Sequence, residues 1–174
     1  MKRALTCLSV LALLLPASAF AESYVADTEA WRAKRYEALK QPDGYLSFIG
    51  SGLVTEGESS VGSAPGSDIV LPKGPAHLGT LTLKPDGTLD FVSAADGAGR
   101  IEGKPFEQVA LKTQLDEGGP TRIDFDTAWF YVVRTGDLVG WRLRDVDSPL
   151  RLGFDGIPHF PVDPTWRIQA RWEP

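Results

Sequence analysis

The sequence predicts an all-β fold, either a β-sandwich or a partly closed barrel of about ten short antiparallel strands, with one N-terminal helix packed on it. Three observations favour this fold class. From Tyr45 onward, short runs alternate apolar and polar residues, as half-buried strands do. Glycine and proline, 18 and 13 of the 174 residues, separate those runs. Only one segment, before Tyr45, has helical spacing instead.

The N-terminal segment, residues 1–21 (MKRALTCLSVLALLLPASAFA), has the layout of a secretory signal peptide. Lys2 and Arg3 give it a basic start, an apolar run follows, and an A-x-A motif ends at Ala21. Because the apolar run is short for a bilayer span, we expect cleavage after Ala21 and no stable membrane insertion afterwards. The expected location is secreted, with the periplasm favoured.

We therefore expect a signal peptide at 1–21, a helical segment at 22–44 and a β-sandwich domain at 45–174. The chain has a net charge of −5, which disfavours nucleic acid as a partner because phosphate backbones reward basic surfaces. Its one cysteine, Cys7, falls in the expected signal peptide. The exported domain should therefore have no disulfide and no cysteine-based zinc site.

The helical segment is expected at residues 27–41, DTEAWRAKRYEALKQ. Asp27 or Thr28 can cap its start, and Pro42 ends it. Trp31 begins a narrow stripe at helical spacing, which would lie against the rest of the domain.

Two ribbons are the clearest strand predictions. Residues 79–93 alternate on both sides of Lys84-Pro85-Asp86-Gly87, which suits a type I turn. Residues 122–145 form the second ribbon, in which 128–133 are apolar on both faces, as in a central buried strand.

Alternation also assigns faces to side chains. Trp141 and Leu143 should face the core, with Arg142 and Arg144 on the opposite face. The same pattern predicts a closing strand near the C-terminus, whose core residues would be Trp166, Ile168, Ala170 and Trp172.

Three segments resemble the bacterial family called domain of unknown function 1684: GYLSFIGSGLVTEGESSVGSAPGSDIVLP, GTLTL and RLRDVDSPLRLGFDGIPHFPVDPTWRIQARW. The most specific pattern is R-D-x-x-S-P-x-R followed by F-P-x-D-x-x-W-R, carried by Arg144, Asp145, Ser148, Pro149, Arg151, Phe160, Pro161, Asp163, Trp166 and Arg167. The resemblance implies a β-rich fold over roughly residues 28–172. Family members continue into a second β-rich half with a D-F-N … N-P-P-C motif, so it also implies that an activity needing that half would be missing here.

A local resemblance lies inside the first. Val61–Pro72, VGSAPGSDIVLP, is similar to the phosphopeptide-reading forkhead-associated domains, which implies a β-sandwich. Gly62-Ser63 stands where those domains carry Gly-Arg, and Ser67-Asp68 where they carry Asn-Asp. Because capture of a phosphate in two hydrogen bonds needs the missing guanidinium, we expect no phosphothreonine binding.

The first functional hypothesis is a binding or envelope-associated module for a small anionic or peptide-like ligand. Every cation after Lys112 is an arginine, and the planar guanidinium suits carboxylates and phosphates. The expected ligand-binding residues are Arg144, Asp145, Arg151 and Arg167. The alternative is that these arginines form ion pairs with neighbouring carboxylates on an open sheet face.

The second hypothesis is a hydrolase with a site around Asp145, Ser148, Arg151, His159 and Asp163. Its catalytic candidates are His159, Ser148 and Asp163, but no G-x-S-x-G elbow or other spacing brings them together. His159 could equally cap backbone groups in a loop. Since calcium-loop and phosphate-loop patterns are also missing from the sequence, we expect no metal and no cofactor. The proline-rich segment from residue 148 to 172 is then either a site or a structural lock.

Overall fold

The computed structural model describes residues 17–173, which fall into two compact units. One unit contains the described residues up to Arg35 together with those from Ile157 onward. The other unit runs from Tyr36 to Gly156 and contains every strand. The expected signal peptide falls largely on residues 1–16, which lie outside the described residues.

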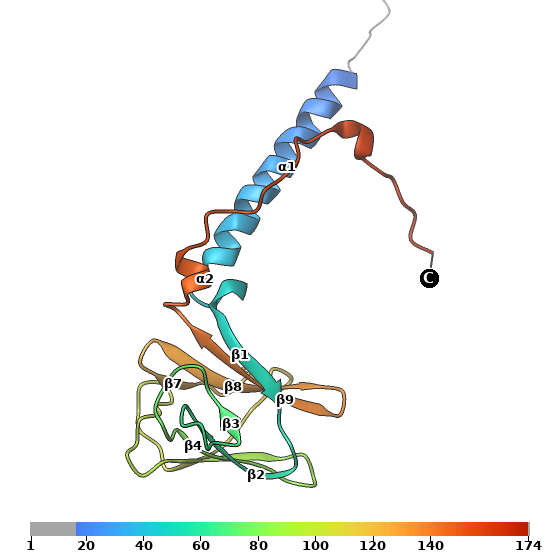
Figure 1. Cartoon of the computed structure of the whole chain (residues 1–174). Coiled ribbons are helices and arrows are strands. Elements are labelled where there is room, and N and C mark those ends of the chain that lie inside the picture. The colour runs from blue at the N-terminus through green and yellow to red at the C-terminus, as the bar shows by residue number, and fades with distance from the viewer. Residues whose placement is uncertain (1–16, 174) are drawn as a thin grey trace, which may run out of the picture. The chain divides into compact units, whose positions relative to one another are not determined.

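Helix α1 (Ala17–Lys40) begins well before the predicted start at Asp27 (Figure 1). Neither Asp27 nor Thr28 caps the start of the helix, because both lie inside it. The Asp27 carboxylate accepts a hydrogen bond from Ser23 Oγ at 3.3 Å, and Thr28 Oγ1 donates to the Tyr24 carbonyl at 2.8 Å. Both side chains make hydrogen bonds inside a continuing helix. Such residues can either cap a helix or bond within it, and sequence spacing alone does not distinguish the two. The packing of the helix on the β-rich domain stays a prediction.

The strand-rich unit consists of two open sheets (Figure 1). The first has the order β1-β9-β8-β7 and the second the order β3-β2-β4-β5-β6. The strands are β1 (Phe48–Leu53), β2 (Gly57–Gly62), β3 (Ile69–Val70), β4 (Gly79–Leu83), β5 (Leu89–Ser93), β6 (Gln108–Ala110), β7 (Ile123–Phe125), β8 (Ala128–Thr135) and β9 (Leu138–Asp145). The described chain is thus mostly strands in two sheets with one N-terminal helix, and the arrangement is sandwich-like. The barrel alternative is wrong, and β2 and β3 pair in parallel rather than antiparallel.

Both predicted ribbons are confirmed as antiparallel pairs, β4 with β5 and β8 with β9. The β4–β5 turn is fixed by Asp86, whose carboxylate accepts hydrogen bonds from the backbone N–H and the hydroxyl of Thr88, at 2.9 and 2.7 Å. These bonds hold the pKa of Asp86 below its usual range. Gly87 has a φ of 83°, which a residue with a side chain rarely adopts.

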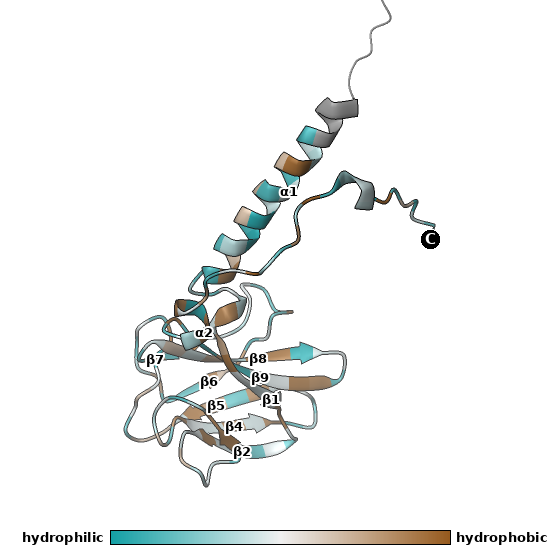
Figure 2. Ribbon diagram, turned by 45° about the horizontal axis from the view of Figure 1, so that its top comes forward, coloured by the Kyte–Doolittle hydropathy of each residue, from teal (hydrophilic) through white to brown (hydrophobic). Residues whose placement is uncertain are grey.

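The core lies between the two sheets, and both contribute hydrophobic residues to it (Figure 2). Phe130 of β8 is completely buried, with its ring 6.0 Å from that of Phe91 and 6.3 Å from that of Trp141. Glycine in β1 makes room for this cluster, because a Cβ at Gly52 would lie 2.7 Å from Nε1 of Trp141. As alternation predicts, Trp141 faces the core and Arg142 does not.

The predicted closing strand is wrong. Trp166, Ile168 and Trp172 are 81, 87 and 87% exposed, and Ala170 is exposed as well. Trp166 ends a short 3-10 helix, η2 (Pro164–Trp166), and no described strand pairs with the residues that follow. Alternation states only which side chains share a face of an extended backbone. A strand also needs a neighbour that completes its hydrogen bonds, and the described chain supplies none here.

None of the helices in the described part of the chain has the length and apolar character needed to cross a bilayer.

Candidate functional site

The site with the clearest chemical character lies on the outer face of the first sheet, the face directed away from the core. Register places Phe48 and Ser51 of β1 beside Arg144 and Arg142 of β9 on this face. Aromatic rings and guanidinium groups alternate across it. The guanidinium of Arg144 lies 3.8 Å from the ring centroid of Phe48, and that of Arg122 lies 4.2 Å from that of Trp129.

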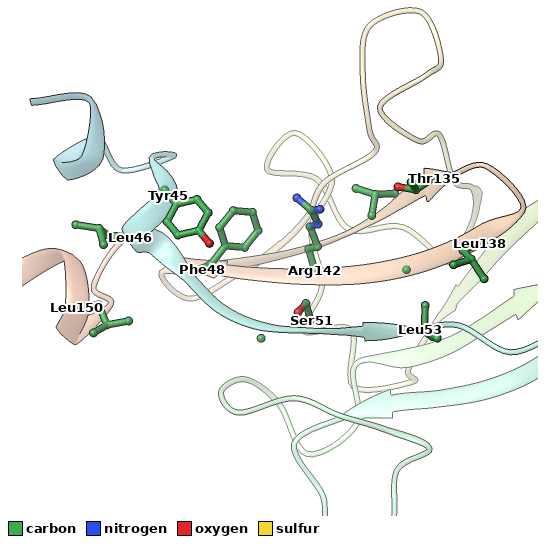
Figure 3. Close-up of a pocket in the computed structure, with 12 residues that line it drawn as sticks. Tyr45, Leu46, Phe48, Ser51, Leu53, Thr135, Leu138, Arg142 and Leu150 are labelled. Atoms are coloured by element: carbon green, nitrogen blue, oxygen red, sulfur yellow. The ribbon is translucent and has the colours of Figure 1, made fainter. Parts of the chain in front are cut away.

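A groove of about 610 Å³ opens on this face, beside β1 (Figure 3). Four exposed apolar side chains line it, from the 3-10 helix η1 (Tyr45–Ser47), β1, β9 and the short helix α2 (Pro149–Leu152): Tyr45, Leu53, Leu138 and Leu150. Gly140 contributes no side chain, so the groove stays open between β1 and β8. This volume falls in the range of roughly 300–1,000 Å³ that small-molecule sites occupy.

Arg142 is the charged side chain of the groove (Figure 3). Its guanidinium lies 5.3 Å from the ring centroid of Phe48. The guanidinium group makes no hydrogen bond and no ion pair with any residue that the structure describes. A guanidinium carries five donors, so Arg142 retains its capacity to bind an anion.

Arg144, a predicted ligand-binding residue, is instead occupied by the chain itself. Its Nη1 donates to the carbonyl oxygens of Asp43 and Gly44, the latter at 2.8 Å, and lies 3.2 Å from Ser47 Oγ. Its Nε donates to the Tyr131 hydroxyl at 3.1 Å. Arg144 therefore fixes the turn that leads into β1, and through that turn it positions one end of the groove.

Arg151, also predicted to bind ligand, caps the C-terminal end of α1. Its Nη1 donates to the Lys40 carbonyl at 2.9 Å, and its Nε donates to the Val146 carbonyl at 2.6 Å. Tyr36 and Phe154 stack with centroids 5.4 Å apart and join the same two segments. The contacts correspond to the structural-lock interpretation, although the acceptors are backbone carbonyls and not the carboxylates that the sequence suggested.

Replacing Arg151 with lysine should therefore lower the stability of the folded protein. A lysine keeps the charge but cannot reach two carbonyls at once, and a hydrogen bond from a charged group contributes about 1.5–3 kcal/mol. We expect a loss of about 1–2 kcal/mol in the free energy of unfolding. Urea melts of the two proteins measure it. Equal midpoints would contradict the capping role.

Asp145, the third predicted ligand-binding residue, makes no hydrogen bond with Arg144 or Arg151. It is buried at the end of β9 and accepts hydrogen bonds from Lys73 Nζ at 2.8 Å, Thr127 Oγ1 at 2.7 Å and the Asp147 N–H at 2.9 Å. Burial opposes its ionisation, but these hydrogen bonds outweigh burial and lower the pKa of Asp145. The bond to Asp145 in turn raises the pKa of Lys73. The carboxylate is thus a buried structural anchor.

The three catalytic candidates are not assembled in a described site. Ser148 belongs to the strand-rich unit, and its hydroxyl is fully buried without a hydrogen-bond partner among the described residues. His159 and Asp163 belong to the other unit. His159 is exposed, and its ring makes no hydrogen bond with the described residues. Asp163 caps η2 by accepting from the Thr165 N–H at 2.9 Å, which lowers the pKa of Asp163.

The remaining predicted site residue, Arg167, lies in the C-terminal segment with its guanidinium 5.4 Å from the ring centroid of Tyr24.

In the forkhead-like stretch, Asp68 accepts hydrogen bonds from the backbone N–H and the hydroxyl of Ser60, at 2.8 and 2.6 Å. The same bonds lower the pKa of Asp68. Among the side chains that the structure describes, no three of His, Cys, Asp or Glu gather as metal ligands would.

Sequence reasoning singled out Arg144 as a ligand-binding residue and not Arg142, whose guanidinium has no partner among the described residues. Strand alternation places the two on the same face, so it does not separate them. The distinction comes from the turn at Asp43-Gly44, whose carbonyls occupy only Arg144. That turn is distant in sequence, and no local signal connects it to β9.

No family model matches the chain, and no curated protein is similar to it. The resemblance to the family of unknown function stays a prediction.

Proposed function

We propose that the strand-rich unit is a binding module for a small ligand that combines an anionic group with an apolar part. The observation that carries the proposal is the guanidinium of Arg142, which stands in an apolar groove without a partner among the described residues. A carboxylate or phosphate would accept hydrogen bonds from Arg142, and the apolar part would cover Leu53 and Leu138.

The chemistry of the groove favours ligands in which the two properties are joined. An anion without an apolar part would leave the exposed leucines in water, and an apolar ligand without an anion would desolvate the guanidinium without replacing its hydrogen bonds. Fatty acids, alkyl phosphates and the carboxyl ends of apolar peptides all meet both conditions. We also propose a secreted, periplasmic location, on the signal-like layout of residues 1–21.

The hydrolase hypothesis is not carried forward. A nucleophile must reach its substrate, and the Ser148 hydroxyl is fully buried. A general base must lie within hydrogen-bond reach of the proton it removes, and His159 has no such neighbour in the described chain.

A thermal-shift experiment tests the binding proposal, because a ligand that binds only the folded state raises the melting temperature. The probes are octanoate, octyl phosphate and N-acetylleucine, with acetate, inorganic phosphate and octanol as partial ligands. We expect the combined probes to raise the melting temperature more than the partial ones. Arg142→Gln should weaken their affinity about tenfold to a hundredfold, because hydrogen bonds from a charged group contribute about 1.5–3 kcal/mol.

Arg122→Gln is the matched control, since Arg122 lies over Trp129 and is paired with Asp124 at 2.8 Å, outside the groove. It should leave the affinities unchanged. A flat response to every probe, or an equal loss in both variants, would count against the groove as the binding site.

A further inference from the structure

The segment from Trp166 to Trp172 (WRIQARW) is the most exposed apolar stretch of the described chain. Trp166, Ile168 and Trp172 are more than four-fifths exposed, whereas Trp129 and Trp141 are 5 and 9% exposed. The residues after Arg167 belong to no helix or strand and make no backbone hydrogen bond with the described residues. Exposed large apolar side chains gathered in one segment mark an interaction surface.

The segment has two chemically different faces. Figure 1 shows the residues after η2 as an extended trace. In an extended backbone, successive side chains lie on opposite sides. Ile168 and Trp172 fall on one side, and Arg167 and Arg171 on the other. The segment contains no acidic residue. An apolar face and a basic face back to back fit a surface where an apolar layer meets anionic groups.

We propose that residues 166–172 dock the exported protein on an anionic lipid surface. Tryptophan is enriched at the boundary between acyl chains and headgroups, because its ring is apolar and its N–H needs a polar partner. Arginine binds lipid phosphates through its planar donors and keeps its charge at the surface while its stem lies along the apolar layer. Arg167, which lies over Tyr24, would exchange that cation–π contact for phosphate.

The composition of the segment favours lipid over pairing with a sheet edge. Ile168 and the two tryptophans suit a strand as well as a lipid boundary, so they do not separate the two kinds of partner. The two arginines do, because the segment has no acidic residue, and such cations fit anionic headgroups and not an uncharged sheet edge. The proposal does not depend on the groove around Arg142.

Vesicle co-sedimentation tests it with the chain from Glu22 to Pro174, because the apolar segment before Ala21 would bind vesicles by itself. The vesicles contain either equal parts of phosphatidylglycerol and phosphatidylcholine or phosphatidylcholine alone. We expect binding to the anionic vesicles, and weaker binding to the neutral ones. Changing both Arg167 and Arg171 to glutamine should lower affinity for the anionic vesicles about 25-fold, since each basic residue near such a surface contributes about fivefold.

Changing both Trp166 and Trp172 to alanine should abolish binding to both kinds of vesicle, and these exposed residues can be replaced without unfolding the protein. Trp31→Ala, at an exposed tryptophan of α1, is the matched control and should bind like the wild type. Equal binding by the wild type and the double tryptophan variant would overturn the proposal. A concentration-dependent dimer that this variant abolishes, without vesicle binding, would assign the segment to a second copy of the chain and also overturn it.

Discussion

Replacing Phe130 with alanine is expected to lower the free energy of unfolding by about 3–5 kcal/mol. The ring of Phe130 is completely buried and packs near Phe91 of the second sheet and Trp141 of β9, the neighbouring strand in its own sheet. Alanine would leave a cavity where the sheets meet, because neighbouring strands relax only in part. Such a loss is a large share of the ~5–15 kcal/mol by which domains are usually stable.

Trp166→Ala is the matched control for this experiment, because it removes a larger aromatic ring from an exposed position. Its effect should stay within about 0.5 kcal/mol, as for most surface substitutions. Urea melts followed by far-ultraviolet circular dichroism compare the three proteins without relying on tryptophan fluorescence. If the two variants had equal midpoints, either Phe130 would not be a core residue or Trp166 would be buried.

The contrast between these two positions shows how far sequence pattern predicts this fold. Residues 79–93 and 122–145 each contain both strands of a ribbon and the turn between them, so the partner of each strand lies close in sequence. Local information was enough to predict both pairs. The segment around Trp166 has an alternation of the same quality, but the described chain offers it no neighbouring strand.

The same limit applies to the candidate site, where sequence pattern predicts the face of a side chain but not its contacts with distant segments. Alternation placed Arg142 and Arg144 on the outer face, which the structure confirms. It did not predict which of the two is free, because the carbonyls that occupy Arg144 belong to the turn before β1. The partner of the buried Asp145, Lys73, was missed for a related reason. Lys73 reaches it from the loop after β3, and no periodic signal connects these segments.

Asp145→Asn is expected to lower the free energy of unfolding by about 2–3 kcal/mol at neutral pH. Asparagine has nearly the same shape, but it removes the charge that receives the Lys73 and Thr127 hydrogen bonds. Breaking a fully buried ion pair costs about 3–5 kcal/mol. The smaller estimate applies here because Lys73 is 33% exposed and lies 3.7 Å from Asp126, so water and a second carboxylate compensate in part.

The pH dependence of this difference identifies its origin. The pKa of Asp145 is lower in the folded protein than its usual value, so its contribution is complete above the unfolded pKa, near 3.9. The contribution is lost as the pH falls through the lowered folded pKa. The pKa of Lys73 is raised, so its contribution is complete below its unfolded pKa, near 10.4, and is lost as the pH rises through the folded value. The stability difference between wild type and Asp145→Asn should therefore be constant around neutrality and shrink in strong acid.

Asp126→Asn separates the loss of the Lys73–Asp145 pair from the general effect of removing an acid near Lys73. The Asp126 side chain is 70% exposed, so its ion pair with Lys73 should contribute about 0–1 kcal/mol. Urea midpoints of the three proteins, measured from neutral pH down to the acid limit of folding, give both comparisons. A deficit in Asp145→Asn that persists unchanged in strong acid would mean that lost packing, and not the lost charge, destabilises the variant. Equal deficits in the two variants would mean that Asp145 has no special role at the end of β9.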